Sequence, residues 1–172
     1  MPDERRGRIW KIYSYAGSSI PDWENSVRVE KDYEEFLRLL NKHKVRYCIT
    51  GSFAVGIYGY ARYTKDIDIV IEPSKENAGR ILKALEEFGF GKVGLKESDF
   101  TKKGNIIHLG YEPVRIDIMT SLSGVGFGEI WRTKKKMTFG NTRVFFIGKK
   151  ELLKTKMKAA RKQDLLDISR IK

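Results

Sequence analysis

Cysteine, proline and long apolar runs are scarce in this chain. Cys48 is the one cysteine among 172 residues, which excludes an internal disulfide and a cysteine-based zinc site. No apolar run approaches the roughly 18–20 residues that a membrane span requires. The first residues also lack the apolar segment of a secretory signal peptide. We therefore expect a cytoplasmic protein that has no membrane association.

The composition is that of a globular protein. Hydrophobic residues make up 41% and charged residues 33% of the chain, as in soluble domains that are long enough to bury a core. Residues 1–30 include Trp10 and Tyr13 and are too apolar for a disordered tail. We expect them to form an N-terminal extension, which could be an edge strand, an arm over the body or a dimer contact, and we expect residues 31–172 to form one domain.

The net charge of +12 is concentrated near the C-terminus. Residues 132–172 contain 14 Lys and Arg but only 3 Asp and Glu. Such a basic segment on a nearly neutral body favours a polyanionic partner, which includes nucleotide phosphates, RNA, tRNA or an acidic protein. The alternative is that the lysines serve solubility alone.

The hydrophobic pattern predicts an α+β fold, with a mixed β-sheet flanked by helices. Asp32 and Glu35 match a capping box and predict a helix start there. Pro73 stops a strand, and Ser74 can cap the helix that follows. Predicted helices cover 33–43, 52–59, 74–89 and 150–168, and predicted strands cover 45–50, 66–71, 106–111, 114–119 and 143–147. Residues 132–136 are predicted to form a basic loop, which could contact RNA or simply be solvated.

Acidic residues alternate with isoleucines in two of the predicted strands. Asp66 and Asp68 point to the same side of their strand, roughly 7 Å apart, and their mutual repulsion favours a bound cation or a proton. Asp117 repeats the alternation in the strand 114–119. If the two strands are neighbours, the three carboxylates converge. A cysteine-free, oxygen-rich site of this kind suits Mg²⁺, and a pair of ions roughly 4 Å apart can align an attacking hydroxyl with a leaving pyrophosphate.

A strand-to-helix turn at Gly51 and Ser52 precedes these carboxylates. Glycine permits a sharp turn and close approach of a ligand. The first N–H groups of the following helix are unpaired and attract phosphate, to which the Ser52 hydroxyl adds a donor. A plain helix cap gives the same pattern, so the turn indicates a phosphate site only together with the carboxylates.

Together these residues resemble the DNA polymerase β-like nucleotidyltransferase superfamily. Residues 50–68 follow the pattern T-G-S-x-A-x-x-x-x-G-x-x-R-x-T-x-D-I-D, and Asp117 follows later. The pattern is most similar to the small prokaryotic branch, which contains the minimal and the abortive-infection toxin nucleotidyltransferases. The segment from Leu152 to Asp167, with Lys156 and Asp164, is similar to the closing helix of that branch. The resemblance spans about residues 33–168.

The resemblance implies a role for each matched residue. Asp66, Asp68 and Asp117 would be the metal-binding and catalytic carboxylates for two Mg²⁺ ions, and Asp117 would also orient or deprotonate the acceptor hydroxyl. The triphosphate contacts would come from the turn and from basic side chains, namely Gly51, Ser52, Arg62, Lys65 and Lys156.

The resemblance implies transfer of a nucleoside monophosphate from a nucleoside triphosphate, such as ATP, to an acceptor hydroxyl with release of pyrophosphate. The acceptor stays open between RNA or tRNA, a protein and a small molecule such as an aminoglycoside. An RNA acceptor would fit a toxin that has an antitoxin partner. The alternative is a non-catalytic nucleotide- or RNA-binding module that keeps the fold, and a homodimer is open as well.

Overall fold

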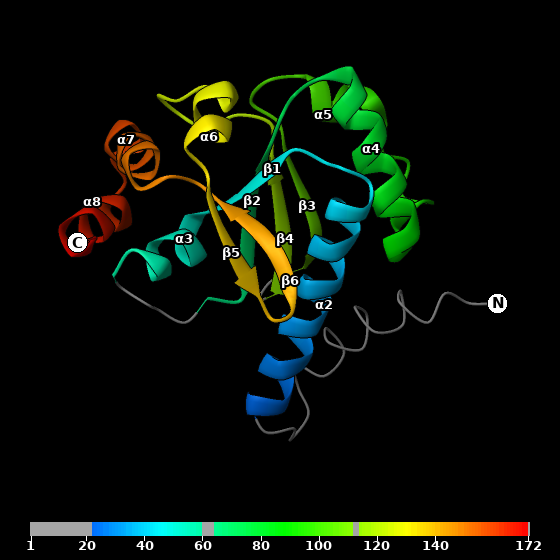
Figure 1. Ribbon diagram of the computed structural model, residues 1–172, viewed down its shortest axis with the longest axis horizontal. Helices are drawn as coiled ribbons and strands as arrows, with labels where there is room; N and C mark the ends of the chain where they lie inside the picture. The colour runs from blue at the N-terminus through cyan, green and yellow to red at the C-terminus, as the bar shows by residue number, and fades with distance from the viewer. Residues whose placement is uncertain (1–21, 60–63, 112–113, 172) are drawn as a thin grey trace.

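A six-stranded mixed sheet forms the centre of the molecule (Figure 1). The computed structural model describes residues 22–59, 64–111 and 114–171, so Arg62 and most of the predicted N-terminal extension lie outside the described residues. The strand order is β3-β4-β2-β1-β6-β5. The strands are β1 (Tyr47–Thr50), β2 (Asp66–Ile71), β3 (Ile106–Tyr111), β4 (Val114–Met119), β5 (Lys135–Phe139) and β6 (Thr142–Phe146).

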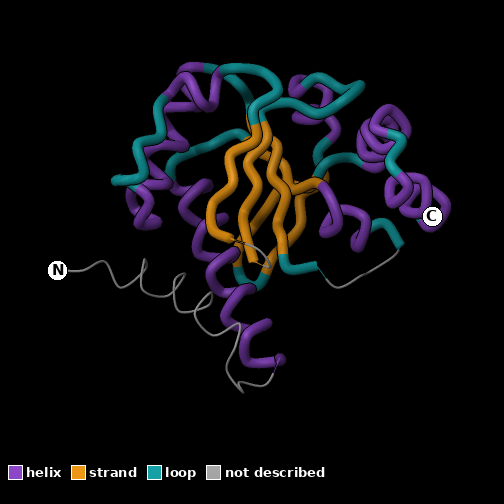
Figure 2. The backbone as a smooth tube through the Cα atoms, turned by 180° about the vertical axis from the view of Figure 1, so that it is seen from behind, coloured by secondary structure: helices purple, strands orange, loops and turns teal. Residues whose placement is uncertain are grey.

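Helices lie on both sides of this sheet, as the front and back views show (Figures 1 and 2). One group consists of α2 (Asp22–Lys42), α4 (Lys75–Leu85), the π-helical turn η1 (Glu86–Phe90) and α5 (Glu97–Thr101). The other group consists of α3 (Gly51–Ile57), α6 (Phe127–Thr133), α7 (Lys149–Ala159) and α8 (Lys162–Arg170). The predicted α+β class is therefore confirmed.

Strand register separates the core from the opposite face of the sheet. Directly paired residues share a face, and the pairs Ile49–Phe146, Ile49–Ile69 and Ile69–Ile118 make one continuous apolar row. All four side chains are buried. Tyr47 lies on this same face and donates its hydroxyl hydrogen to Asn41 Oδ1 of α2. The isoleucines of the D-I-D-I pattern thus face α2, and its aspartates face the other way.

Several predicted elements are confirmed and one helix start is wrong. Strand β2, the β3–β4 hairpin and the Ser74 cap, which accepts a hydrogen bond from Asn77 N, agree with the prediction. Asp32 does not begin a helix, because α2 already starts at Asp22. Residues 22–42 contain neither glycine nor proline, so nothing interrupts the helix before the capping-box pattern.

The C-terminal part differs from the prediction at two places. The predicted helix 150–168 is two helices, α7 and α8, because Ala160 adopts a left-handed conformation with φ 49° and ends α7. Part of the predicted basic loop 132–136 belongs instead to the edge strand β5. Lys135 and Lys136 are exposed there, and lysines on an edge strand discourage pairing with another chain.

Replacing Ala160 with glycine should stabilise the protein. The left-handed conformation costs an L-residue about 1–2 kcal/mol, and glycine avoids this cost at the expense of some unfolded-state entropy. We expect Ala160→Gly to raise the free energy of unfolding by about 0.5–1 kcal/mol, measured by urea denaturation. Ala159→Gly, inside α7, is the control and should lower it by about 1 kcal/mol. Destabilisation by both variants would contradict the prediction.

Candidate active site

The register that builds the core also aligns four polar residues across the opposite face. Thr50 of β1 pairs with Asp68 of β2, Asp68 pairs with Asp117 of β4, and Asp117 pairs with His108 of β3. Paired residues share a face, so these side chains form one row across four neighbouring strands. The predicted proximity of Asp68 and Asp117 is therefore confirmed by parallel pairing of β2 with β4.

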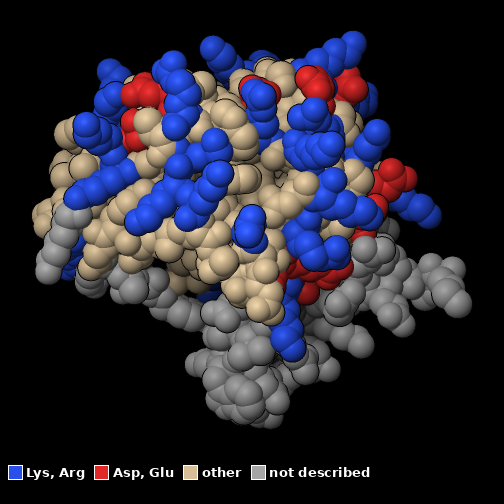
Figure 3. Space-filling model, viewed as in Figure 1, with Lys and Arg blue, Asp and Glu red and all other residues tan. Residues whose placement is uncertain are grey.

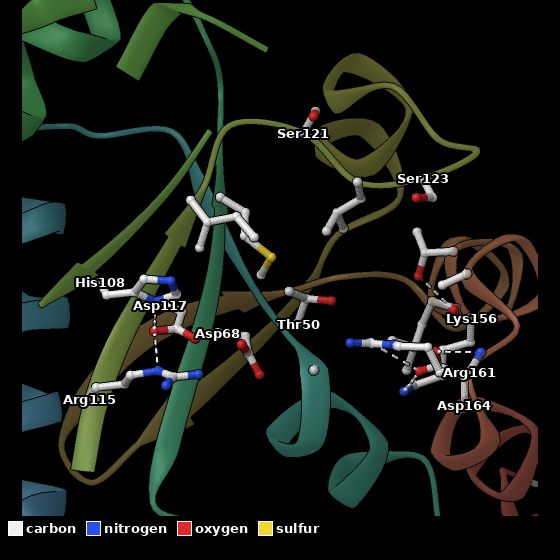
Figure 4. Close-up of a pocket in the computed structure, with 17 residues that line it drawn as sticks. Thr50, Asp68, His108, Arg115, Asp117, Ser121, Ser123, Lys156, Arg161 and Asp164 are labelled. Carbon is white, nitrogen blue, oxygen red and sulfur yellow. Dashed lines mark hydrogen bonds and ion pairs between the residues drawn. The ribbon is translucent and has the colours of Figure 1, made fainter. Parts of the chain in front are cut away.

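This polar row forms one wall of a cleft of about 550 Å³. The second wall comes from α7 and the start of α8, and the loop after β4 lies above (Figure 4). The side chains of the two walls face each other across an open centre (Figure 4). The lining residues are Thr50, Gly51, Asp68, Ile106, His108, Arg115, Asp117, Met119, Ser121, Leu122, Ser123, Leu152, Thr155, Lys156, Ala159, Arg161 and Asp164.

Gly51 is required by its contact with Asp68. Its φ is +63°, a conformation that favours glycine, and a Cβ atom built there would overlap with the Asp68 carboxylate. The turn therefore brings bare backbone against this carboxylate. A larger residue would displace either the start of α3 or the Asp68 side chain.

Asp68 holds a proton more tightly than an exposed aspartate does. Burial, followed by repulsion from Asp117 and Asp66, raises its pKa from 3.8 to about 6, although Arg115 and Lys156 partly oppose the shift. At neutral pH the group is thus mostly ionised, at an energetic cost. A bound cation would relieve both the burial penalty and the repulsion.

Asp117 is held in one orientation by two neighbours. It is buried, and its Oδ1 accepts hydrogen bonds from Arg115 Nε at 2.7 Å and from His108 Nδ1 at 2.8 Å. Because an ionised carboxylate only accepts, the imidazole hydrogen lies on Nδ1. The other carboxylate oxygen points towards Asp68 and the cleft (Figure 4). The arrangement therefore presents one oxygen for a ligand and uses the other for positioning.

The second wall contains a buried ion cluster. Lys156 Nζ lies 3.1 Å from Asp164 Oδ1 and 2.7 Å from Asp167 Oδ2, and Arg161 Nε lies 2.7 Å from Asp164 Oδ2. Although burial alone would raise the pKa of Asp164, the hydrogen bonds from Arg161 and Lys156 hold it below its usual value. Lys156 and Asp164, which the sequence places in one predicted helix, belong to two helices and meet between them, because the chain turns at Ala160.

The structure places most of the predicted site residues together. Gly51, Asp68, Asp117 and Lys156 line the cleft. Asp66 precedes Asp68 by two residues in β2, so both side chains lie on the same face. The charge of Asp66 contributes to the raised pKa of Asp68.

Three residues that are predicted to contact phosphate are not among the cleft residues that the structure describes. Within the described part of the chain, Ser52 and Lys65 are not among the residues that line the cleft. Arg62 lies outside the described residues. Their roles as phosphate contacts stay predictions.

Sequence reasoning missed His108, Arg115 and Arg161 as cleft residues. The predicted hairpin could have indicated both His108 and Arg115. Arg115 is two residues from Asp117 and so shares its face, and the β3–β4 register pairs His108 with Asp117. Arg161 could not be found this way, because its position depends on the break between α7 and α8.

The acidic residues suit Mg²⁺ better than a metal that needs a closed protein cage. Among the described residues no three acidic or histidine side chains converge as a complete metal-binding group. Mg²⁺ usually keeps several waters and binds through one or two carboxylates and substrate phosphates. Asp68, whose ionised form is disfavoured by burial and by repulsion from Asp117 and Asp66, fits this mode together with Asp66.

A family model described as aminoglycoside-2''-adenylyltransferase matches residues 33–125, which include the turn and all three aspartates. The chain belongs to this family. Membership confirms the predicted superfamily and nucleotidyltransferase activity class, whereas the assignment to the toxin branch stays a prediction. None of the curated proteins compared matches the chain.

Two solved structures are similar in fold. A Thermotoga maritima protein assigned as a nucleotidyltransferase is 18% identical with a TM-score of 0.55, over 90% of this chain and 96% of that one. The lincosamide antibiotic adenylyltransferase LnuA, solved with lincomycin bound, is 17% identical with a TM-score of 0.51, over 83% and 95% of the two chains. Both confirm the nucleotidyltransferase fold. None of the described helices has the length and apolarity needed to cross a bilayer.

Removal of Lys156 should destabilise the second wall. Lys156→Met leaves Asp164 and Asp167, both almost fully buried, without their shared cation, and breaking a buried ion pair on one side costs about 3–5 kcal/mol. Urea denaturation measures the loss. Lys158→Met removes an exposed lysine two residues further along α7 and should change stability by less than about 0.5 kcal/mol. Equal effects of the two variants would show that the cluster contributes little.

The raised pKa of Asp68 predicts a pH-dependent effect on stability. In the folded state Asp68 stays protonated up to about pH 6, whereas in the unfolded state it ionises near pH 4. Stability is therefore lost as pH rises from about 4 to about 6, and it is not regained at higher pH. Asp68→Asn removes this cost and should stabilise the protein by on the order of 1–3 kcal/mol at pH 7.5. The gain should vanish near pH 4.

Thermal unfolding across this pH range, with and without Mg²⁺, measures the effect. The exposed Glu86→Gln is the matched control and should show no pH-dependent gain. We also expect Mg²⁺ to raise the melting temperature of the wild type more than that of Asp68→Asn. Destabilisation by Asp68→Asn at pH 7.5 would contradict the interpretation of Asp68 as a strained ligand.

Proposed function

We propose that this protein is a Mg²⁺-dependent adenylyltransferase that transfers AMP from ATP to a hydroxyl group of a small molecule and releases pyrophosphate. The observation that carries the proposal is the row of Asp68 and Asp117 beside the Gly51 turn. Membership in an adenylyltransferase family supports it. Residues 31–172 would form the catalytic domain.

Each wall of the cleft has a separate task in this proposal. Asp66 and Asp68 would hold Mg²⁺, which supplies charge neutralisation for the phosphates and alignment of the reacting groups. Asp117, fixed through Oδ1 by Arg115 and His108, would use its other oxygen to orient the acceptor hydroxyl and take its proton. Gly51 leaves room for phosphate oxygens near the backbone. Positioning and charge stabilisation would then supply most of the catalysis.

The comparisons support an antibiotic or a similar small molecule as acceptor. The matched family is described by an aminoglycoside activity, and LnuA acts on lincosamides. They give no support to an RNA or protein acceptor, to a toxin role or to an antitoxin partner. A non-catalytic binding module is disfavoured by the energetics, because such a module gains nothing from a buried, mutually repelling pair of aspartates.

Labelled transfer tests the proposal directly. Purified protein with Mg²⁺ and α-labelled ATP should move label onto acceptors in a panel of antibiotics. Asp117→Asn should lower kcat by at least about 100-fold, the size expected for loss of proton transfer, while binding of Mg²⁺ and ATP persists. Glu86→Gln, far from the cleft, should keep full activity. Full activity of Asp117→Asn would overturn the assigned role.

A further inference from the structure

A second row of side chains lies beside the catalytic row, and it is apolar. Val70 of β2 pairs with Met119 of β4, and Met119 pairs with Ile106 of β3. The row is two residues further along the strands than Asp68 and Asp117, a spacing of roughly 7 Å. Met119 and Ile106 line the cleft, and Ile106 is 54% exposed. We call this row, with Leu122 above it, the apolar wall.

The apolar wall lies on the acceptor side of the catalytic row. The Gly51 turn and Arg161, which suit phosphates, are at the β1 and α8 end of the cleft (Figure 4). An in-line displacement places the attacking hydroxyl opposite the leaving pyrophosphate. The acceptor hydroxyl therefore reaches Asp117 from the β3 side, and the body of the acceptor rests on Met119 and Ile106.

The cleft offers no spare carboxylate for a polycation. Among the described lining residues the acidic groups are Asp68, Asp117 and Asp164. The first two serve the metal and the hydroxyl, and the third is already bound to Lys156 and Arg161. An ammonium group of an acceptor would thus compete with the catalytic ion for its ligands.

The surroundings of the cleft are basic. Lys102 and Lys103 are exposed just before Ile106, and the exposed Lys158 lies against Gly124 of the loop above the cleft. The molecule as a whole is also basic: on the face seen in Figure 3, lysine and arginine side chains predominate, with acidic groups among them. Repulsion between like charges at close range strongly disfavours the binding of a polycationic acceptor.

We propose that the acceptor is a hydroxylated molecule with an apolar part and at most one positive charge, and that polycationic aminoglycosides are excluded. The proposal rests on the proposed function and narrows its substrate class. This acceptor class differs from the aminoglycosides that the description of the chain's family names. Ser121 and Ser123, which line the cleft near Leu122, supply neutral hydrogen-bonding groups for sugar hydroxyls.

An acceptor panel sorted by charge tests the proposal. Wild-type protein with Mg²⁺ and α-labelled ATP is offered the polycations kanamycin and tobramycin, the singly charged lincomycin, and neutral octyl glucoside. We expect labelled product from lincomycin or octyl glucoside, with kcat/KM at least about tenfold above that of either polycation. Equal or better use of kanamycin overturns the proposal. So does a lack of product from the whole panel by protein that binds Mg²⁺ and ATP.

Failure of the proposed function gives a different result. Binding of ATP is measured separately by calorimetry with Mg²⁺ and a non-hydrolysable ATP analogue. If the analogue does not bind and no acceptor is labelled, the adenylyltransferase proposal itself fails, and the acceptor class fails with it. Binding of the analogue with product only from polycations keeps the proposed function and overturns the acceptor class.

A charge placed on the apolar wall sharpens the test. Ile106→Glu should lower kcat/KM for the accepted neutral or singly charged compound by about tenfold, should increase the use of kanamycin relative to it, and should leave binding of the ATP analogue unchanged. Val93→Glu adds the same charge at an exposed apolar residue outside the cleft and should change none of these values. An unchanged acceptor preference in Ile106→Glu overturns the assignment of the apolar wall to the acceptor.

Discussion

Parallel pairing of β2 with β4 is the constraint on which the site depends. The same register buries Ile69 beside Ile118 in the core and directs Asp68 and Asp117 to the cleft on the other face. Because strand side chains alternate, a slip by one residue would bring the aspartates into the core and the isoleucines into the cleft. Burial of the isoleucines therefore stabilises the arrangement of the aspartates, and this burial offsets the local cost of repulsion between the carboxylates.

Strands β2 to β4 and the Gly51 turn could be predicted well from sequence because their signals are local. Alternation in Asp66–Ile71, the Gly51 turn and the β3–β4 hairpin each depend on neighbouring residues. The second wall could not be predicted, since the approach of Lys156 to Asp164 and Asp167 depends on one left-handed residue, Ala160. The hydrophobic periodicity of the sequence does not indicate such a break between two helices.

The two walls of the cleft have different physical characters. The sheet wall carries Asp68, whose pKa is raised by burial and by repulsion from Asp117 and Asp66, while Arg115 and Lys156 oppose this shift only in part. The helical wall carries a compensated cluster, and its pKa shift at Asp164 is downward. A cation is therefore attracted to the first wall, whereas the second is already satisfied and gives the cleft a fixed shape.

The two hydrogen bonds that fix the Asp117 carboxylate have a stereochemical consequence. Since Arg115 and His108 both occupy Oδ1, a single oxygen faces the cleft, from one direction (Figure 4). Under the proposed function, an acceptor with several hydroxyl groups would have to present the reacting one to that oxygen while its apolar part lies over Met119 and Ile106. Both contacts can be made together for few of its hydroxyls. Modification at one defined position, giving a single regioisomer, follows from this fixed carboxylate.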